Sequence, residues 1–119
     1  MKPRITVITL GVDDLEVSLR FYRDGLGLET EGIVGTEFEY GAVVFIVLQT
    51  GLRLALWPRA SIARDSGLVP GAKSPTEFTL GHNVSTRAEV DAVMEQAEGA
   101  GASIVKPAGD TFARRFLCR

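Results

Sequence analysis

Hydrophobic and polar positions along the first part of the chain change from the period of a strand to that of a helix. Residues 5–12 are rich in β-branched side chains and predict a strand. Asp13, with Glu16 three residues later, has the form of a capping box and predicts the start of a helix. Gly25 and Gly27 predict its end. Between these limits, apolar side chains recur at helical spacing at Leu15, Leu19 and Tyr22.

The same order of elements begins again in the second half of the chain. Residues 78–84 predict a strand, and Thr86 with Glu89 has the form of a second capping box. A second helix end is predicted at Gly99 and Gly101. The chain therefore starts one structural plan twice. The apolar stripe of the second helix consists of Val90, Val93, Met94 and Ala97.

Three apolar or alternating stretches follow the first helix and predict three further strands. Gly41 and the Thr50-Gly51 pair predict the turns between them. The first unit is therefore predicted as a strand, a helix and three more strands. The three stretches are residues 28–40, 42–49 and 52–57.

Residues 58–76 predict the connection between the two units. They contain three prolines and two glycines and show little periodicity, apart from one short helical turn expected at residues 61–65. A connection of this length often covers a binding site.

The composition is that of one ordinary domain. The chain has 119 residues, of which 45% are apolar and 24% charged, and this length suffices to bury a core. No apolar run approaches the roughly 20 residues that span a bilayer, so no membrane is expected as a partner. The first residues lack the apolar region and cleavage site of a signal peptide, and we expect a cytoplasmic protein.

Charge and cysteine content limit the possible chemistry further. The net charge is −2, and Lys and Arg residues are interspersed with Asp and Glu, which argues against nucleic acid as a partner. Only the tail is locally basic, at Arg114, Arg115 and Arg119. Cys118 is the single cysteine, so a disulfide within the chain and a cysteine metal cluster are both excluded.

The first helix also carries a specific motif. The pattern V-x-D-L-E-x-S-L-x-F-Y-x-x-x-L-G-L is matched at every specified position between Val12 and Leu28. Together with a β-α-β-β-β unit begun twice, this motif resembles the vicinal oxygen chelate superfamily, which includes glyoxalase I, bleomycin-resistance proteins and extradiol dioxygenases. The resemblance extends from residue 4 to about residue 110.

The resemblance implies an α+β fold in which paired β-α-β-β-β units form a curved mixed sheet around a cavity. We expect residues 1–119 to form a single domain of this type. Unit one then covers residues 4–57, the connection covers residues 58–76, and an incomplete unit two covers residues 77–119.

Metal-dependent members of the superfamily place ligands on the concave side of the first and last strands of each unit. The corresponding positions in unit one are Val7 and Ala55, and neither side chain has a donor atom. In unit two, matching the TLG triplets pairs Val7 with Glu77, whereas matching the valines before the helices pairs it with Thr79. We therefore expect no metal and no cofactor.

His82 is the only histidine, but a structural role is favoured for it. Strand alternation would place Glu77 and Thr79 on the cavity side and His82 on the helix side. The strand that would carry the last metal-binding glutamate is not found, because Asp110-Thr111-Phe112 is followed by ARRFLCR. This ending is interpreted as a shifted reading frame, an artificial end or a natural shortened form.

Alternation on the fourth strand also predicts a small-molecule site. Leu52, Leu54 and Leu56 suit the helix-facing side, which leaves the intervening residues and one face of residues 43–49 for the concave side. The alternative is that Trp57 fills the core and Arg53 is solvated at an edge of the sheet. Phe21 and Tyr22 of the first helix are interpreted as core residues. The predicted binding residues are Val7, Thr9, Arg53, Ala55, Trp57 and Thr79.

Three classes of function follow. The favoured one is a metal-free protein of the bleomycin-resistance kind that binds a small organic molecule; catalytic residues are not assigned. The second is a metal-dependent lyase, isomerase or dioxygenase of the same superfamily. The third is a structural remnant without a ligand. Fold alone does not separate these classes.

A homodimer is expected because a unit that lacks its last two strands leaves a sheet edge unpaired. The predicted contact involves the first strand at residues 5–12, the connection at residues 58–76 and the tail from Thr111 onwards, where Phe112, Phe116 and Leu117 are the sizeable apolar side chains.

Overall fold

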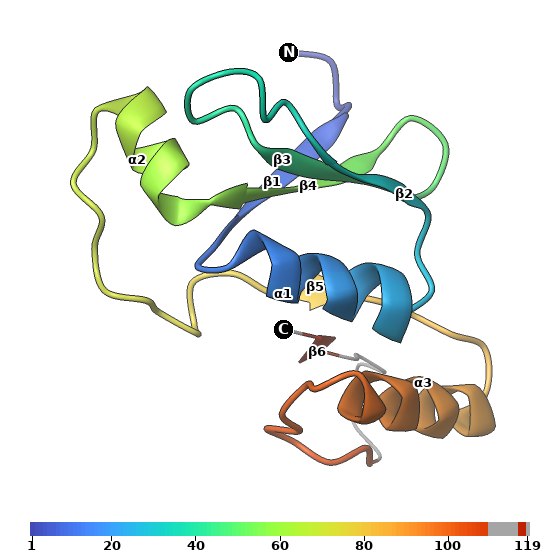
Figure 1. Ribbon diagram of the computed structural model, residues 1–119. Helices are drawn as coiled ribbons and strands as arrows, with labels where there is room; N and C mark the ends of the chain where they lie inside the picture. Colours follow the sequence, from blue (N-terminus) through green and yellow to red (C-terminus); the bar gives the residue numbers. More distant parts are fainter. Residues whose placement is uncertain (110–116, 119) are drawn as a thin grey trace. The chain divides into compact units, whose positions relative to one another are not determined.

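The computed structural model describes residues 1–109, 117 and 118 and divides into two compact units, Met1–Gly71 and Ala72–Arg119 (Figure 1). The division falls inside the stretch that the sequence predicts as a connection. Predictions that concern the segment from Asp110 to Phe116, and those for the terminal Arg119, lie outside the described residues.

Four strands of the first unit form one curved mixed sheet in the order β1-β4-β3-β2 (Figure 1). β1 (Val7–Val12) pairs in parallel with β4 (Arg53–Pro58). β3 (Val43–Val47) pairs antiparallel with both β4 and β2 (Thr30–Val34). The sheet does not close, so β1 and β2 lie at its edges. The predicted α+β class and the order of elements in this unit are confirmed.

A loop at residues 35–42 replaces the second half of the strand predicted over residues 28–40. Gly35 has a φ of 78°, in the left-handed region that glycine adopts without steric cost. The amide of Phe38 donates to the Gly35 carbonyl, and the amide of Gly41 donates to the Phe38 carbonyl, both at 3.1 Å. These turns use backbone groups that a strand would pair with its neighbour, so the strand prediction was wrong for this segment.

The first helix is capped by Asp14 rather than by Asp13. Asp14 lies in the extended conformation directly before α1 (Leu15–Leu19). Its carboxylate accepts hydrogen bonds from the amides of Glu16 at 3.0 Å and Val17 at 3.2 Å. The predicted capping box was therefore wrong by one residue.

The helix continues into a wider turn, η1 (Arg20–Gly25), which has the hydrogen-bond pattern of a π-helix. The amide of Leu26 donates to the Phe21 carbonyl at 2.9 Å, five residues back. Phe21 and Tyr22 form an edge-to-face pair with centroids 4.9 Å apart, and both are half-buried. Gly27, with a φ of 72°, follows the end of the helix as the sequence predicts.

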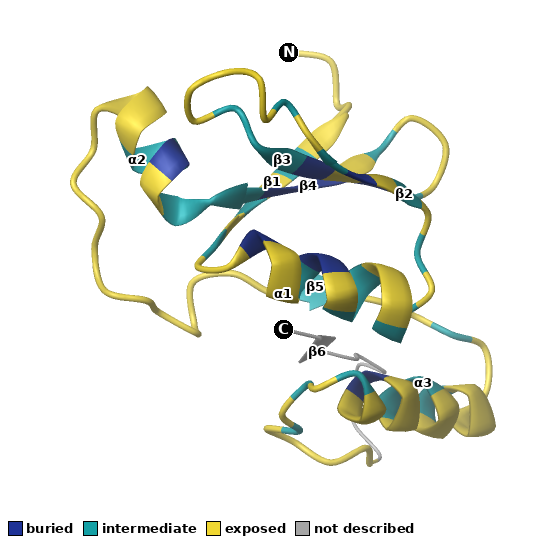
Figure 2. Ribbon diagram, in the orientation of Figure 1, coloured by how far each residue is buried: buried dark blue, intermediate teal, exposed yellow. Residues whose placement is uncertain are grey.

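The core of the first unit lies between α1 and one face of the sheet, as the dark residues in Figure 2 show. Side chains alternate across β3 and β4, so every second residue of each strand faces α1. The predicted helix-facing side of β4 is thereby confirmed at Leu54 and Leu56. The buried residues that form this core are Leu15, Leu19, Val44, Ile46, Leu54 and Leu56.

A second helix follows β4 directly and packs against the sheet. α2 (Arg59–Ser66) begins after Pro58 and ends before Gly67, which has a φ of 73°; only a shorter turn was predicted here. Gly11 of β1 permits the close approach of α2, because a Cβ at that position would lie 3.0 Å from the Arg59 Cγ and 3.3 Å from the Ile62 Cδ1.

The second unit contains a short sheet and one long helix. β5 (Leu80–Gly81) pairs antiparallel with β6 (Leu117–Cys118), so the strand predicted over residues 78–84 is observed only at its centre. α3 (Arg87–Gly99) is capped by Thr86, as predicted.

Two hydrogen bonds hold the start of α3. The Thr86 hydroxyl accepts from the Glu89 amide at 3.1 Å, and the Glu89 carboxylate accepts from the Ser85 amide at 3.3 Å. The predicted stripe of apolar residues is confirmed, since Ala97 is buried and Val90, Val93 and Met94 are half-buried. Within the described residues, no helix combines the length and apolar character needed to cross a membrane.

Replacing Asp14 by alanine tests the observed cap of α1. The variant should lose about 1 kcal/mol of unfolding free energy, because the amides of Glu16 and Val17 lose their acceptor. Asp13→Ala is the matched control: it removes a partly exposed ion pair with Arg59, 3.6 Å long, but leaves the acceptor of the Glu16 and Val17 amides in place. Urea unfolding followed by circular dichroism measures both losses. An equal or larger loss in Asp13→Ala would contradict the cap assignment.

Candidate functional site

The candidate site lies on the pocket face, which we define as the side of the first-unit sheet opposite Leu54 and Leu56. Residues that pair across neighbouring strands point to the same side, so the register arranges the pocket face in rows. Each row runs from β1 through β4 toward β3. The first row is Val7, Arg53 and Val47, and the second is Thr9, Ala55 and Phe45. The third is Gly11 and Trp57.

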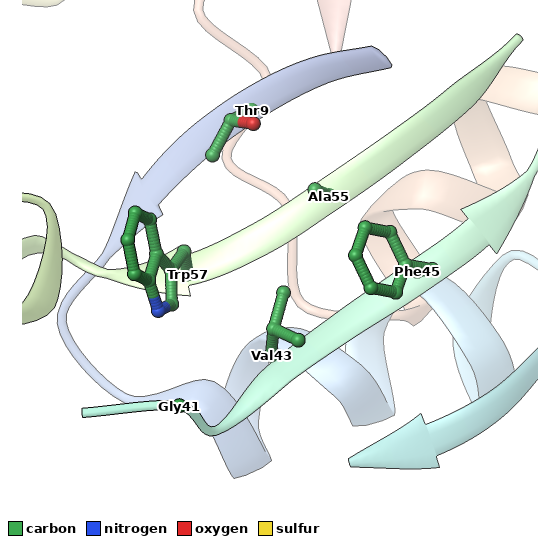
Figure 3. A pocket seen from close by; sticks show the side chains of 6 residues that line it. All are labelled: Thr9, Gly41, Val43, Phe45, Ala55 and Trp57. Atoms are coloured by element: carbon green, nitrogen blue, oxygen red, sulfur yellow. The ribbon is translucent and has the colours of Figure 1, made fainter. Parts of the chain in front are cut away.

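A hollow of about 280 Å³ opens over the second and third of these rows (Figure 3). Its side chains are mostly apolar, and the Thr9 hydroxyl is the one side-chain oxygen among them. Predicted binding residues Thr9, Ala55 and Trp57 thus come together in one hollow. The lining residues are Thr9, Gly41, Val43, Phe45, Ala55 and Trp57.

Ala55 forms the floor of the hollow. It lies on β4 between the rings of Phe45 and Trp57, is 3% exposed, and contributes only a methyl group to the lining (Figure 3). A larger side chain at this position would occupy the hollow. The site is therefore a space between two aromatic rings over a small residue, a composition suited to apolar ligands.

Trp57 is held against the loop at residues 35–42. Its indole Nε1–H donates to the backbone carbonyl of Tyr40 at 3.2 Å. Tyr40 has a φ of 57°, which is uncommon for a residue other than glycine, and the Arg64 guanidinium lies 4.9 Å from the centre of its ring. These contacts on both sides of Tyr40 fix the loop beside the hollow and orient the indole.

The sequence analysis missed the contribution of this loop to the site. Gly41, predicted only as a turn, lines the hollow. A Cβ at Gly35 would collide with the Gly41 carbonyl oxygen, so the two glycines permit a close approach of the backbone. The pair of glycines flanking a short segment was the signal in the sequence. Val43 and Phe45 belong to the stretch whose face was expected to contribute.

Two other predicted residues lie on the pocket face but do not line the hollow. Val7 and Arg53 form the adjacent row, and Val7 is 44% exposed. The Arg53 guanidinium carbon lies 5.8 Å from the centre of the Phe45 ring, and Phe45 does line the hollow. Arg53 is therefore at the rim of the site. Thr79 belongs to the second unit, directly before β5, and its assignment to the same site stays a prediction.

Arg23 and Asp24, two residues with perturbed titrations, lie away from the hollow. Arg23 donates a hydrogen bond to Asp24 at 2.8 Å, which lowers the pKa of the Asp24 carboxyl and raises the pKa of the guanidinium. Both side chains are largely exposed, and neither lines the hollow. This pair therefore offers no acid or base to the site.

The residues at the positions implied for a metal do not fit one. Val7 and Ala55 supply no oxygen, nitrogen or sulfur donor. In the part of the chain that the structure describes, no three His, Cys, Asp or Glu side chains are grouped around a common point. Glu77 and His82 are both exposed, and neither lies within β5. Because both residues lie outside the strand, the alternation of strand side chains does not determine which way they point.

The chain belongs to the Glyoxalase/Bleomycin resistance protein/Dioxygenase superfamily, whose pattern matches residues 4–117. A solved structure of a glyoxalase-related enzyme from Fulvimarina pelagi shares 32% identity, with a TM-score of 0.76 over 92% of this chain and 73% of that one. The family resemblance noted in the sequence is thereby confirmed.

Two further solved structures are similar. A glyoxalase/bleomycin resistance protein/dioxygenase from Nocardioides shares 26% identity, with a TM-score of 0.69 over 94% of this chain and 71% of that one. A lactoylglutathione lyase from Agrobacterium tumefaciens shares 23% identity, with a TM-score of 0.60 over 89% of this chain and 76% of that one, and supports the fold alone. No match was found among curated proteins.

The donor-free positions lead to a prediction about metal content. Protein incubated with Ni, Zn, Fe or Mn salts and then desalted should retain no stoichiometric metal, because Val7 and Ala55 cannot coordinate. Elemental analysis and native mass spectrometry measure the metal per chain, and the latter also reports any small molecule that co-purifies. One tightly held metal per chain would show that donors elsewhere in the protein form a centre.

Proposed function

We propose that this protein binds a small organic molecule in the hollow of the pocket face without a metal ion, as a member of the bleomycin-resistance kind. The observation that carries the proposal is Ala55, a small residue between the Phe45 and Trp57 rings. It occupies the position where the family resemblance implies a metal-binding glutamate. A methyl group in place of that carboxylate removes a metal ligand and leaves room for a small organic molecule.

Exposure of the pocket face supports binding rather than a purely structural role. Val7, Phe45 and Val47 are 44%, 36% and 48% exposed, whereas the opposite face is buried in β3 and β4 and half-buried in β1. Contiguous apolar surface on a soluble domain often marks an interaction site. The hollow of about 280 Å³ is slightly below the range of roughly 300 to 1,000 Å³ for ligand pockets, which favours a ligand of about one aromatic ring.

The alternative is a metal-dependent lyase, isomerase or dioxygenase. Its support is the similarity to a solved structure described as a glyoxalase-related enzyme. The side chains of Val7 and Ala55, which have no donor atoms, argue against it.

A cytoplasmic location also stays a prediction of the sequence.

Trp57 provides the test of the binding proposal, with phenylacetamide as a neutral aromatic probe. Trp57→Ala should fold but bind the probe more weakly by roughly 1 to 3 kcal/mol, because one aromatic wall of the hollow is lost. Backbone amide shifts of Thr9, Phe45 and Ala55 report binding in both proteins. As Trp57 is the only tryptophan, its fluorescence in the unsubstituted protein should also respond.

Val17→Ala is the matched control for this experiment. It shortens an exposed apolar side chain of α1, on the other side of the sheet, and should leave the affinity unchanged. Equal affinity in Trp57→Ala would reject Trp57 as a binding residue. Probe-induced shifts confined to residues outside the pocket face would reject the hollow as the site.

We also propose a homodimer that uses the edge of the sheet at β1. β1 is paired on one side only in the described sheet, and Ile5 before it is 59% exposed. Leu68 and Val69, which follow α2, are 72% and 90% exposed and suit the same contact. Unpaired edges and apolar side chains of this kind are commonly covered by a second chain. The predicted contribution of the tail from Thr111 lies mostly outside the described residues.

Ile5→Glu tests the dimer. Sedimentation at micromolar concentration should give twice the 12.8 kDa chain mass for the unsubstituted protein and a shift toward monomer for Ile5→Glu, because the edge becomes charged. Val17→Glu places the same charge on a similarly exposed position of α1 and should remain dimeric. A 12.8 kDa species for the unsubstituted protein would refute the dimer.

A further inference from the structure

Arg53 is the one charged residue in the three strands that form the pocket face around the hollow, and all three strands lie within the described residues. β1 reads VITLGV, β3 reads VVFIV and β4 reads RLALWP. The register places Arg53 between Val7 and Val47, both apolar and about half exposed. An aliphatic residue at this position would continue the apolar pattern of the strands, so the positive charge of Arg53 calls for a functional explanation.

No carboxylate of the described residues pairs with Arg53. Two ion pairs of the described residues, Arg23 with Asp24 and Arg59 with Asp13, do not involve it. The described contact of Arg53 is with an aromatic face, 5.8 Å from the centre of the Phe45 ring. A guanidinium over a ring keeps its N–H groups, which lie in its own plane, available for an anion. The cation at the rim of the hollow therefore has unused donors.

We propose that the small ligand of the hollow is an aromatic carboxylate, whose ring lies over Ala55 between Phe45 and Trp57 and whose carboxylate is bound by Arg53. This inference rests on the proposed binding function and specifies its ligand class. A guanidinium binds a carboxylate through two parallel N–H···O bonds, which orients the ligand as well as attracting it. The Thr9 hydroxyl, in the row of Ala55, is the second polar group that can contact the ligand.

The spacing of the rows suits such a ligand. Arg53 and Ala55 are two residues apart on one strand, so their Cα atoms are separated by roughly 6.6 Å. A ring over Ala55 with a short arm toward Arg53 spans this distance. A purely apolar ligand would instead remove water from the guanidinium without supplying an acceptor, which is unfavourable.

Phenylacetate and phenylacetamide are the matched probes, since they share their ring and arm and differ in charge. At low ionic strength we expect phenylacetate to bind about tenfold more tightly, the lower end of the range for charge-assisted hydrogen bonds at an exposed site. Added NaCl should reduce this preference. Amide shifts of Thr9, Phe45 and Ala55 give the affinity and location of each probe.

Arg53→Gln should abolish the preference for phenylacetate while leaving the binding of phenylacetamide nearly unchanged. Arg53→Lys should retain part of the preference, because an ammonium attracts the carboxylate but cannot bind it bidentately. Arg20→Gln is the control, since it removes the same charge from an exposed position of η1. Urea unfolding confirms that each variant folds.

The outcomes separate this inference from the function on which it rests. Equal binding of both probes in the hollow would overturn the anion assignment and leave small-molecule binding supported. A preference that survives Arg53→Gln would overturn Arg53 as the anion-binding residue. Failure of both probes to shift any pocket-face resonance at millimolar concentration would count against the binding function and the ligand class together.

Discussion

The parallel pairing of β1 with β4 determines both faces of the first unit. Because parallel strands require a crossover connection, α1, η1, β2 and β3 all lie between them in the sequence. The same register that places Leu54 and Leu56 toward α1 places Ala55 beside Thr9 and Trp57 beside Gly11 on the pocket face. A shift of one residue would exchange the two faces and bring Arg53 into the core. The apolar core and the site are therefore consequences of one strand register.

The loop at residues 35–42 adds to this sheet what strand pairing alone cannot provide, a wall for the hollow. The backbone carbonyl of Tyr40 accepts the hydrogen bond that a half-buried indole needs, and Arg64 of α2 lies against the Tyr40 ring. The positive φ of Tyr40 has an energetic cost, which surrounding contacts must offset. The orientation of Trp57 thus depends on a turn, on a helix that follows β4 and on β4 itself.

Residue patterns were sufficient for the order of the strands and the first helix of the first unit, and for three of the residues that line the hollow. Alternation in β4 correctly separated Leu54 and Leu56 from Ala55 and Trp57, because successive side chains of a strand point to opposite faces of the sheet. Predictions from the residue patterns were wrong where more than one local conformation is compatible with the sequence. Asp13 and Asp14 can each cap a helix, and only backbone geometry selects between them. The turns after Gly35 and the short extent of β5 depend on hydrogen-bond partners elsewhere in the chain, which periodicity does not describe.

The absence of donor side chains at Val7 and Ala55 also affects the electrostatics of this site. A site with a glutamate at the Ala55 position would carry a negative charge suited to a cation, whereas the three strands around the hollow here contain one positive charge and no negative one. Arg53 is exposed at the rim of the hollow, so water and salt partly screen this charge. The absence of a carboxylate at Ala55 and the presence of Arg53 act in the same direction. Together they favour the organic anion proposed as the ligand of the pocket face, for which apolar contacts would supply affinity and the guanidinium would supply orientation.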